Sequence, residues 1–348
     1  MPHSAILRRV MALFGVAWLL AAGDAAAEVR LVGASVPVDA PTKIADRLGY
    51  FNSGLSPGDP SWIEVVYAPA GRDGLGQLVR GETAFALMSP TPIAAAALEQ
   101  KMAGVQSDLV VVASIGRSSQ THQIVAKRGA GIIAPGDLEG RRVGLLVGSS
   151  AEFVWTDFAR AHGMDPSAWT TVDVRPGDEL AALSSGLVDV VATWSPFSDR
   201  LARALGDEAV VFPTRDIYSL SWLLVTTRAI ADEEPALVDR VLEAYLRAID
   251  LQLRDPARAQ RLHAAVTDED EAELARLDTG NIWRLELGWA LVANVEEQLR
   301  WLAGDLPPPM LPTSRDYVHA AAMHRVAPHR LALPDHLLQA SAPAPVQP

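Results

Sequence analysis

The sequence predicts an α/β protein built from two similar units, each with a mixed sheet flanked by helices. Short runs rich in β-branched residues alternate with amphipathic helical stretches over the first two thirds of the chain, which is typical of sheets covered by helices. The alternation starts again near Val143, and the last third shows long helical periods instead. These three observations predict two α/β units followed by a helical region.

The first unit is defined by apolar runs that lie between turn residues. Gly49 and Gly81 are expected to end helices, and the segment Ser89 to Pro92 breaks the chain and begins another helix. The predicted strands are Val29–Gly33, Trp62–Tyr67, Thr83–Met88, Leu109–Ile115 and His122–Ala126, and the helices include Pro41–Leu48, Leu75–Val79 and Ala94–Leu98.

The second unit contains the most informative stretch of the chain, Gly140 to Phe153. A short apolar strand is followed by Gly148, which permits a sharp turn, and by Ser149 and Ser150 at a helix start. Free N–H groups at such a start can hold an anion, although an ordinary serine cap explains the same pattern. The predicted elements are strands Val143–Val147, Thr171–Val174 and Val188–Thr193, and helices Glu152–His162 and Asp178–Leu183.

The last third of the chain is predicted to return to the first unit. Leu220 to Thr226 is an apolar strand, and apolar residues from Val238 to Ile249 follow the helical period before Pro256. A second long helix is predicted over Ile282 to Leu302, with Gly304 as its C-terminal cap.

The two ends of the chain are expected to lie outside the folded units. Residues 1–27 have arginines, an apolar run and the small residues Ala25 to Ala27, which is the pattern of a secretory signal peptide. The apolar run is short for a membrane anchor, which is the alternative. Because the chain has no cysteine, it carries neither a disulfide nor a thioether-linked lipid, and we expect a periplasmic location. Residues 331–348 are predicted to be a disordered tail, most clearly from Ala340.

Composition and motifs exclude several classes of function. A net charge of −12 and a pI near 5.1 argue against binding nucleic acid or an anionic membrane, but not against a small anionic ligand. No nucleophile elbow or phosphate-binding loop is present, and Gly71, Gly74 and Gly76 have the wrong spacing for a dinucleotide site. Histidines at every fifth position near the C-terminus do not share a helical face, so no metal or cofactor is predicted.

Four segments together resemble the solute-binding proteins of ABC importers for nitrate, sulfonates, taurine and thiamine precursors. They are Ala45 to Phe51, Gln77 to Pro92, Asp137 to Phe153 and Leu183 to Phe197, in that order, although Thr83 stands where the family usually has aspartate. The related thiamine pyrimidine synthases carry a cysteine-rich motif that this chain lacks.

The resemblance implies a two-lobed periplasmic binding protein fold (type II) that closes on its ligand and performs no chemistry. The expected lobes are residues 28–118 with 222–330, and residues 119–221, with crossings near 118–123 and 218–222. The expected partners are a small solute and an ABC permease with its ATPase, and the protein is expected to be a monomer. A sulfonate-type, nitrate-like or zwitterionic solute is predicted; a thiamine-type pyrimidine, or docking to a membrane receptor as a sensor, is the alternative.

Candidate ligand residues lie at strand ends and crossings. Each also has a structural interpretation as a helix cap, core residue or hinge contact. Arg117 could hold an oxyanion in bidentate fashion or be a solvated loop residue. Glu152, if it faces the cleft, would favour an ammonium group, and otherwise it stabilises the helix dipole. The full set is Pro37, Val38, Ser89, Pro90, Thr91, Arg117, His122, Ser149, Ser150, Glu152, Trp194, Phe197, Tyr218 and Ser219.

Overall fold

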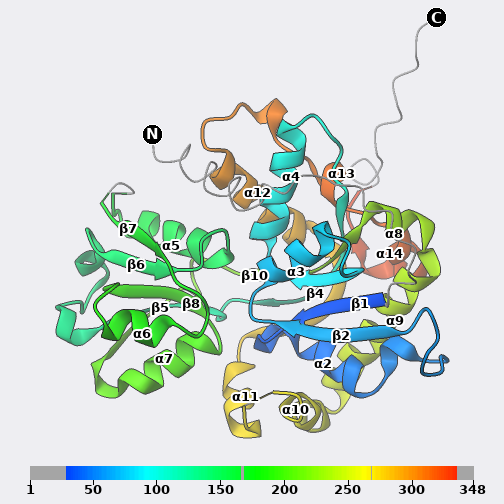
Figure 1. The fold of residues 1–348 in the computed structure, drawn as a ribbon, viewed down its shortest axis with the longest axis horizontal. Helices are drawn as coiled ribbons and strands as arrows, with labels where there is room; N and C mark the ends of the chain where they lie inside the picture. Colours follow the sequence, from blue (N-terminus) through cyan, green and yellow to red (C-terminus); the bar gives the residue numbers. More distant parts are fainter. Residues whose placement is uncertain (1–28, 166–167, 268, 335–348) are drawn as a thin grey trace, which may run out of the picture.

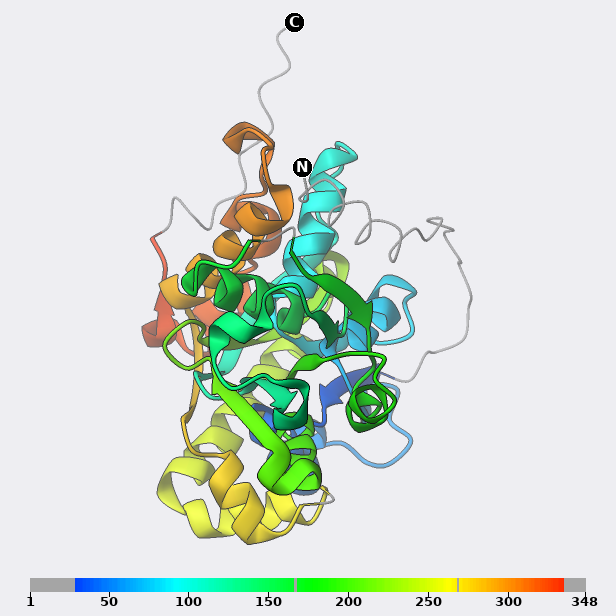
Figure 2. The ribbon, with the colours of Figure 1, turned by 90° about the vertical axis from the view of Figure 1, so that its left-hand side faces the viewer.

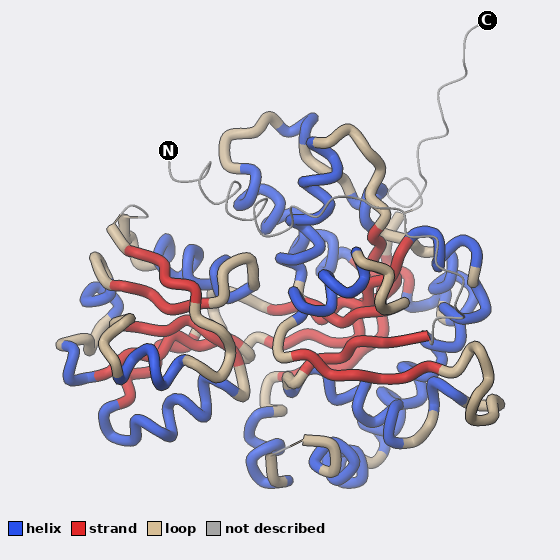
Figure 3. The backbone as a smooth tube through the Cα atoms, viewed as in Figure 1, coloured by secondary structure: helices blue, strands red, loops and turns tan. Residues whose placement is uncertain are grey.

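The computed structural model describes residues 29–165, 168–267 and 269–334 and contains two lobes that lie side by side (Figure 1). The predicted signal peptide and the part of the predicted tail beyond residue 334 lie outside the described residues. Figure 3 shows the strands gathered into two separate sheets, one in each lobe.

The large lobe is built on a seven-stranded mixed sheet in the order β12-β11-β4-β10-β3-β1-β2. β1 runs parallel to β2 and β3, whereas β10 is antiparallel to both β3 and β4. The strands are β1 (Val29–Ala34), β2 (Ile63–Ala68), β3 (Phe85–Met88), β4 (Leu109–Ser118), β10 (Leu220–Thr227), β11 (Asn281–Gly288) and β12 (Leu331–Ala332).

Helices cover both faces of this sheet. In Figure 1, α3 (Gly71–Val79), α4 (Pro90–Met102) and α12 (Trp289–Ala303) lie above it, and α2 (Ala40–Arg47) and α9 (Pro235–Arg254) lie below it. The remaining helices of the large lobe are α8 (Arg228–Glu233), α10 (Pro256–Ala264), α11 (Glu271–Leu277), α13 (Ser314–Tyr317) and α14 (Ala321–Val326).

The small lobe is built on a five-stranded sheet in the order β7-β6-β8-β5-β9. Figure 1 shows α5 above this sheet and α6 and α7 below it. Its elements are β5 (His122–Lys127), β6 (Arg142–Leu145), α5 (Ser150–Ala161), β7 (Thr170–Asp173), α6 (Glu179–Ser184), β8 (Val190–Trp194), α7 (Phe197–Leu205) and β9 (Ala209–Pro213).

The chain passes between the two sheets twice, from β4 to β5 and from β9 to β10. Each passage is short, and β10 already belongs to the large sheet from Leu220 onward. We propose the division into residues 28–118 with 222–330, and 119–221, as the boundary between lobes. Figure 2 views the molecule from the small-lobe side, with α10 and α11 below the junction and α4 and α12 above it.

The prediction of one helix over Ile282 to Leu302 is wrong, because this segment contains both β11 and α12. Leu285 and Leu287 are fully buried and two residues apart, which is the spacing of a strand. β11 pairs with β4, so the hydrogen-bonding edge of β4 is satisfied by a strand rather than by a helix. The change to a helix comes at Gly288, the N-cap of α12.

Two further features differ from the sequence-based expectations. Pro256 ends α9 as predicted, but it also begins α10, a helix that the sequence reasoning did not assign. Leu331 and Ala332, in the predicted tail, pair with the end of β11. Within the described residues, no helix is both long enough and apolar enough to cross a bilayer.

Candidate functional site

A small cavity, here called the central pocket, lies at the junction of the lobes. Its volume is about 20 Å³, enough for about one water molecule. Both lobes and the second crossing contribute side chains, at the carboxyl ends of parallel strands, where ligands bind in open α/β sheets. The lining consists of Val36, Pro69, Ala70, Gly71, Arg72, Ser89, Pro92, Thr121, His122, Ser149, Ser150, Trp194, Leu220 and Trp222.

Three helices begin at this pocket. α3 begins at Gly71 and α4 at Pro90, after strands of the large lobe, and α5 begins at Ser150, after β6 of the small lobe. A helix start presents the positive end of the helix dipole and, except where proline stands, unpaired N–H groups; α4 begins with Pro90 and Pro92, which have no N–H. On the large-lobe side the dipoles of α3 and α4 therefore favour an anionic group, whereas on the small-lobe side the buried Glu152 carboxylate, in the first turn of α5, offsets the dipole of that helix.

The two serines at the start of α5 have different roles. The Ser149 hydroxyl accepts a hydrogen bond from the Ala151 N–H at 3.2 Å and donates to the Leu146 carbonyl at 2.7 Å, so it caps the helix. The Ser150 hydroxyl lies 2.8 Å from Nε2 of His122. Ser150 is therefore tied to a pocket residue rather than to its own helix.

His122 is a neutral polar group of the pocket. It is 4% exposed, and burial lowers its pKa from 6.5 to about 3. Its ring packs edge-on against Tyr218 with a centroid distance of 5.4 Å. His122 can thus exchange a hydrogen bond with Ser150 or with a ligand, but it adds no positive charge at neutral pH.

Arg72, in the first turn of α3, supplies the positively charged side chain of the central pocket. Its Nη1 donates a hydrogen bond to the carbonyl of Val147 in the small lobe. The guanidinium therefore joins the lobes, and it retains further N–H donors for an oxyanion.

The Asp39 carboxylate fixes the large-lobe wall of the pocket. It is fully buried and accepts hydrogen bonds from the Ala34 N–H at 2.7 Å and from Trp222 Nε1 at 3.0 Å. Burial raises the pKa of Asp39, and the adjacent Lys43 ammonium opposes that rise. Since Trp222 lines the pocket, this buried network holds one pocket wall in place.

The structure brings some of the predicted ligand residues together in the central pocket and places others elsewhere. Ser89, His122, Ser149, Ser150 and Trp194 line it. Pro37 and Phe197 line a second cavity between the lobes. Pro90 is buried at the first position of α4 without lining either cavity.

Several predicted residues have structural partners instead. Val38 is in the core, and its carbonyl accepts a hydrogen bond from Trp283 at 3.1 Å. Thr91 is fully buried and donates to Gln298. The Tyr218 hydroxyl donates to Asn294 Oδ1 at 3.3 Å, and the Ser219 carbonyl accepts from Asn294 Nδ2 at 2.7 Å. These last two contacts attach the second crossing to α12.

The two charged candidates also lie apart from the pocket lining. Arg117 lies on β4 and pairs with Glu286 across to β11, with 3.7 Å between Nε and Oε1. Glu152 is buried, and its Oε2 accepts a hydrogen bond from the Gly148 N–H at 2.8 Å. Glu152 thus stabilises the turn that leads into α5.

The sequence reasoning missed Arg72, Thr121, Trp222 and the segment before α3. A signal for Arg72 was present, because Gly71-Arg72 follows a predicted strand at a helix start, as Ser149-Ser150 does. Trp222 lies inside a predicted apolar strand, and it reaches the pocket because of the register in which β10 pairs with β4.

Ion pairs join the lobes at a second place, here called the α7–α11 rim. It consists of Asp199, Arg200 and Arg203 of the small lobe and Glu269, Glu273 and Arg276 of the large lobe. Arg276 pairs with Asp199 at 3.1 Å, Arg200 with Glu269 at 2.7 Å, and Arg203 with Glu273 at 2.8 Å. All three arginine side chains are about half exposed, so the rim is in contact with solvent.

Solved structures of other proteins share the two-lobed fold. No curated protein sequence matches the chain. The fold is similar to that of the alkanesulfonate-binding protein SsuA from Xanthomonas axonopodis pv. citri bound to MOPS, with a TM-score of 0.66 and 20% identity over 82% of this chain and 95% of that chain. The periplasmic aliphatic sulphonate binding protein SsuA from Escherichia coli gives a TM-score of 0.62 and 19% identity, covering 82% and 94% of the two chains.

A third solved structure is more distant. The periplasmic nitrate-binding protein NrtA from Synechocystis PCC 6803 gives a TM-score of 0.52 and 14% identity, covering 67% of this chain and 64% of that chain. At the level of sequence families, residues 40–259, more than half of the chain, match the family described as NMT1/THI5 like. The chain therefore belongs to the NMT1/THI5-like family and has the two-lobed fold of periplasmic binding proteins.

Proposed function

We propose that this protein is the exported solute-binding component of an ABC importer and binds a small sulfonate-type, or other oxyanionic or zwitterionic, organic solute between its lobes. The central pocket carries this proposal. Three helix starts and Arg72 surround it, and they come from both lobes. The Arg72 guanidinium is the donor best suited to a compact oxyanion, and the helix dipoles of α3 and α4 add to its attraction.

Binding in the central pocket requires the lobes to move. A volume of about 20 Å³ is too small for a sulfonate group, and the Arg72 to Val147 hydrogen bond spans the junction. The solute would enter an open form, replace that contact with its own oxygen atoms and shift the population to a closed form. A membrane permease, with its ATPase, would recognise that closed form.

The relatives support the transport role. Two SsuA proteins that share the fold are described as binding sulfonates, and NrtA is described as binding nitrate. The same comparison and the signal-peptide pattern of residues 1–27 support a periplasmic location. The proposal needs no catalytic step, since differential affinity for the open and closed forms is sufficient.

A thermal-shift screen tests the solute class. The panel contains methanesulfonate, taurine, nitrate, sulfate, acetate, amino acids and a hydroxymethylpyrimidine. We expect sulfonates to raise the midpoint by several degrees, because ligand at about 100 times its Kd adds about 2.7 kcal/mol. A shift with the pyrimidine alone would contradict the oxyanion proposal, and a flat response to the whole panel would contradict binding of these solutes.

Paired variants test the central pocket. Arg72→Gln should weaken methanesulfonate binding roughly 10- to 100-fold, because a hydrogen bond to a charged group contributes about 1.5–3 kcal/mol. Arg300→Gln is the matched control, since that side chain is 67% exposed on α12 and pairs only with its helix neighbour Glu296 in the described contacts. Equal affinity of the two variants would show that Arg72 does not contact the solute.

A further inference from the structure

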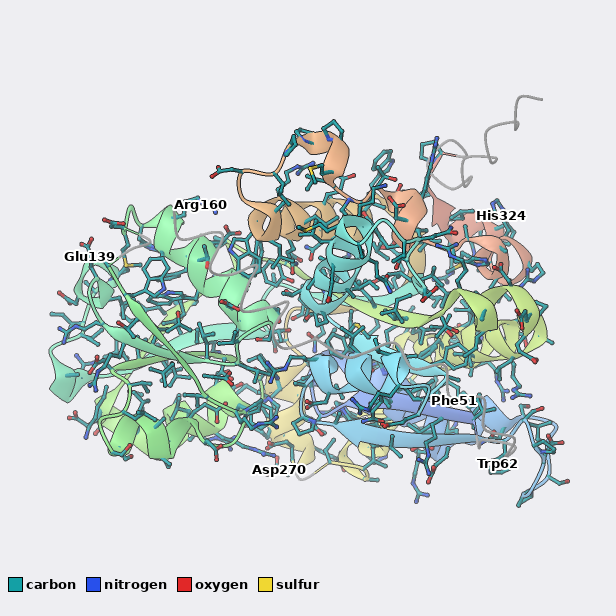
Figure 4. All side chains as sticks on the ribbon, turned by 45° about the horizontal axis from the view of Figure 1, so that its top comes forward. Phe51, Trp62, Glu139, Arg160, Asp270 and His324 are labelled. Carbon is teal, nitrogen blue, oxygen red and sulfur yellow. The ribbon has the colours of Figure 1, made fainter. Side chains whose placement is uncertain are left out.

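A cavity of about 460 Å³, here called the α3–α4 groove, lies between helices α3 and α4 of the large lobe. Both helices cover the upper face of the large sheet in Figure 1, and that face is turned forward in Figure 4, where α4 is drawn in cyan. The volume is within the range of pockets that hold small organic ligands. The solute proposed above does not occupy this groove, although Arg72 lines both the groove and the central pocket.

Gln100 contributes to the groove a buried side chain without a hydrogen-bond partner. It is 5% exposed, and its Oε1 is buried and accepts no hydrogen bond among the described residues. Ala96, Gln100 and Ala103 are four and three positions apart, so they share one face of α4, and all three line the groove. A buried carboxamide oxygen without a partner is costly, and an N–H group of a ligand can supply the missing donor.

Glu99, the neighbour of Gln100, adds a half-buried carboxylate to the lining. Burial raises the pKa of Glu99, and no other effect contributes to the shift. A cation close to the carboxylate would lower that pKa, so Glu99 has no effective counter-charge. The carboxylate and the Gln100 oxygen both need donors, and an ammonium group carries three N–H donors and a positive charge.

Three arginines also line the groove, but each has a partner or faces solvent. Arg80 donates two hydrogen bonds to the Glu82 carboxylate, at 2.6 and 2.9 Å. Arg72 lies at the start of α3, at the junction of the lobes, and Asp73 beside it contributes a carboxylate to the same lining. Arg175 reaches the groove from the small lobe and is exposed, so solvent screens its charge. These arginines therefore leave the carboxylate on α4 available to a cationic ligand.

The walls between the polar groups are apolar and leave room for a ligand. Leu75 and Val79 of α3 face Ala96 of α4 across the groove. Gly76 also lines it, although glycine inside a helix is destabilising relative to alanine. A Cβ on Gly76 would meet the movable guanidinium of Arg80, at 3.1 Å from Nη1, so packing does not require glycine here. Its effect is to keep the groove wide enough for an apolar chain or ring.

We propose that the α3–α4 groove is a second ligand site, for an organic ammonium ion with an apolar chain or ring. The ammonium group lies at Glu99 and Gln100, and the apolar body lies along Leu75, Val79 and Ala96. This site is on the large lobe, outside the central pocket, and it takes a ligand of the opposite charge. The inference therefore goes beyond the proposed function and does not depend on it.

Calorimetric titration with three probes of similar shape tests the inference. 4-Phenylbutylamine carries an ammonium group, 4-phenylbutanol a hydroxyl group and 4-phenylbutyrate a carboxylate, all on the same apolar body. We expect the amine to bind at least about tenfold more tightly than the other two, because a hydrogen bond between charged groups is the stronger one. If the butyrate binds as tightly as the amine, the arginines select the ligand and the inference is wrong.

Variants of α4 test the place of the ammonium group. Glu99→Gln should lower the affinity for the amine about tenfold or more and change that for the alcohol by no more than about twofold. Gln100→Met keeps the length of the side chain and should weaken the amine several-fold. Glu139→Gln is the matched control, since this exposed carboxylate lies at the outer side of the small lobe (Figure 4). Equal affinity of Glu99→Gln and Glu139→Gln for the amine, or full affinity of Gln100→Met, would contradict the placement.

Filling the groove provides a test that does not remove charge. Gly76→Leu should abolish binding of the amine, whereas Ala257→Leu adds the same side chain at an exposed position of α10 and should bind normally. Thermal unfolding of both variants checks that they are folded, and normal binding by a folded Gly76→Leu protein would refute the site.

The outcomes separate this inference from the proposed function. Binding of the amine with no response to any sulfonate would overturn the proposed solute class and support the α3–α4 groove. Binding of methanesulfonate without binding of the amine would support the proposed function and overturn this inference.

Discussion

The two lobes differ in how their sheets are covered. Every residue of β3 in the large lobe is buried, and β10 is buried from Leu220 to Thr226. In the small lobe the flanking strands β7 and β9 are largely half-buried or exposed. One face of the small sheet joins the main hydrophobic core through α5, where Phe153 packs on Trp301 of α12 with 5.4 Å between ring centroids.

The opposite face of the small sheet has its own, separate hydrophobic cluster. It lies between the sheet and helices α6 and α7 and contains Val125, Val174, Ala182, Leu183, Val188, Val191 and Leu201. A small cluster buries little apolar area, so its elements should open more readily than the large sheet. We therefore expect the α7 side of the small lobe, which faces the second cavity and the rim, to move more easily than the rest of the molecule.

The largest expected effect is on the large lobe. Asp39→Asn removes the charge that offsets the buried Lys43 ammonium and gives Trp222 Nε1 a poorer acceptor. Breaking a buried pair in this way costs about 3–5 kcal/mol. Urea unfolding measures the change. Asp216→Asn is the control, because that side chain is 93% exposed, and equal stability of the two variants would contradict the role of Asp39.

A smaller and more local loss of stability is expected from Leu201→Ala, which removes most of a buried side chain from the separate cluster of the small lobe. Leu201 is 3% exposed, and such a truncation costs about 2–3 kcal/mol where the surroundings can partly collapse. Hydrogen exchange should accelerate in β5 and β8 while β3 stays protected. Leu180→Ala, at a side chain that is 41% exposed, should change neither, and uniform acceleration in both sheets would refute the separate behaviour of the lobes.

His122 should make stability depend on pH. Its folded pKa of about 3 lies below its ordinary value of 6.5, so the unfolded chain binds the proton more tightly. The stability is therefore complete above pH 6.5 and falls by about 1.4 kcal/mol per unit as the pH drops from 6.5 toward 3. His122→Gln should remove that part of the slope. The test is the difference in urea unfolding between the two proteins at pH 7 and pH 5, and identical slopes would contradict the assignment.

The smallest expected effect is at the α7–α11 rim. Arg276 is half exposed, so Arg276→Gln should change the free energy of lobe closure by about 0.2–1 kcal/mol. The change should disappear at high salt, because exposed charges are screened. Small-angle scattering at low and high NaCl measures the closed fraction, with Arg254→Gln as the control at a 78% exposed helix pair. An effect of the same size at both salt concentrations would contradict an ionic origin.

Most strands and helices could be predicted because each carries its own periodicity. The prediction for the segment before α12 was wrong because the spacing of Ile282, Leu285 and Leu287 also fits a helix. The segment is a strand because it pairs with the edge of β4. Helices α10 and α11 were not assigned, since their first turns follow directly on a proline or an acidic cap outside a clear apolar pattern.

The site residues that could be predicted are those at turns where a strand ends and a helix begins. Ser89, Ser149 and Ser150 follow strands at helix starts, and they do line the central pocket. Arg117 and Glu152 have charges suited to a ligand, but their partners Glu286 and the Gly148 N–H are visible only in the folded chain. A sequence shows which side chains can bind, whereas the competing partners are set by packing.

The two α/β units, the return of the chain through β10 and the hydroxyl-rich helix starts can be predicted from the sequence, because strand period, helix period and turn residues act over a few neighbouring positions. Three features depend on the folded structure: Arg72 spans the junction, Asp39 holds Trp222, and Lys43 and His263 share a cavity. Lys43 and His263 are far apart along the chain and meet only because α2 and α10 pack at the same end of the large lobe. Local propensity carries no information about such long-range contacts, which follow from burying the apolar faces of the two helices together.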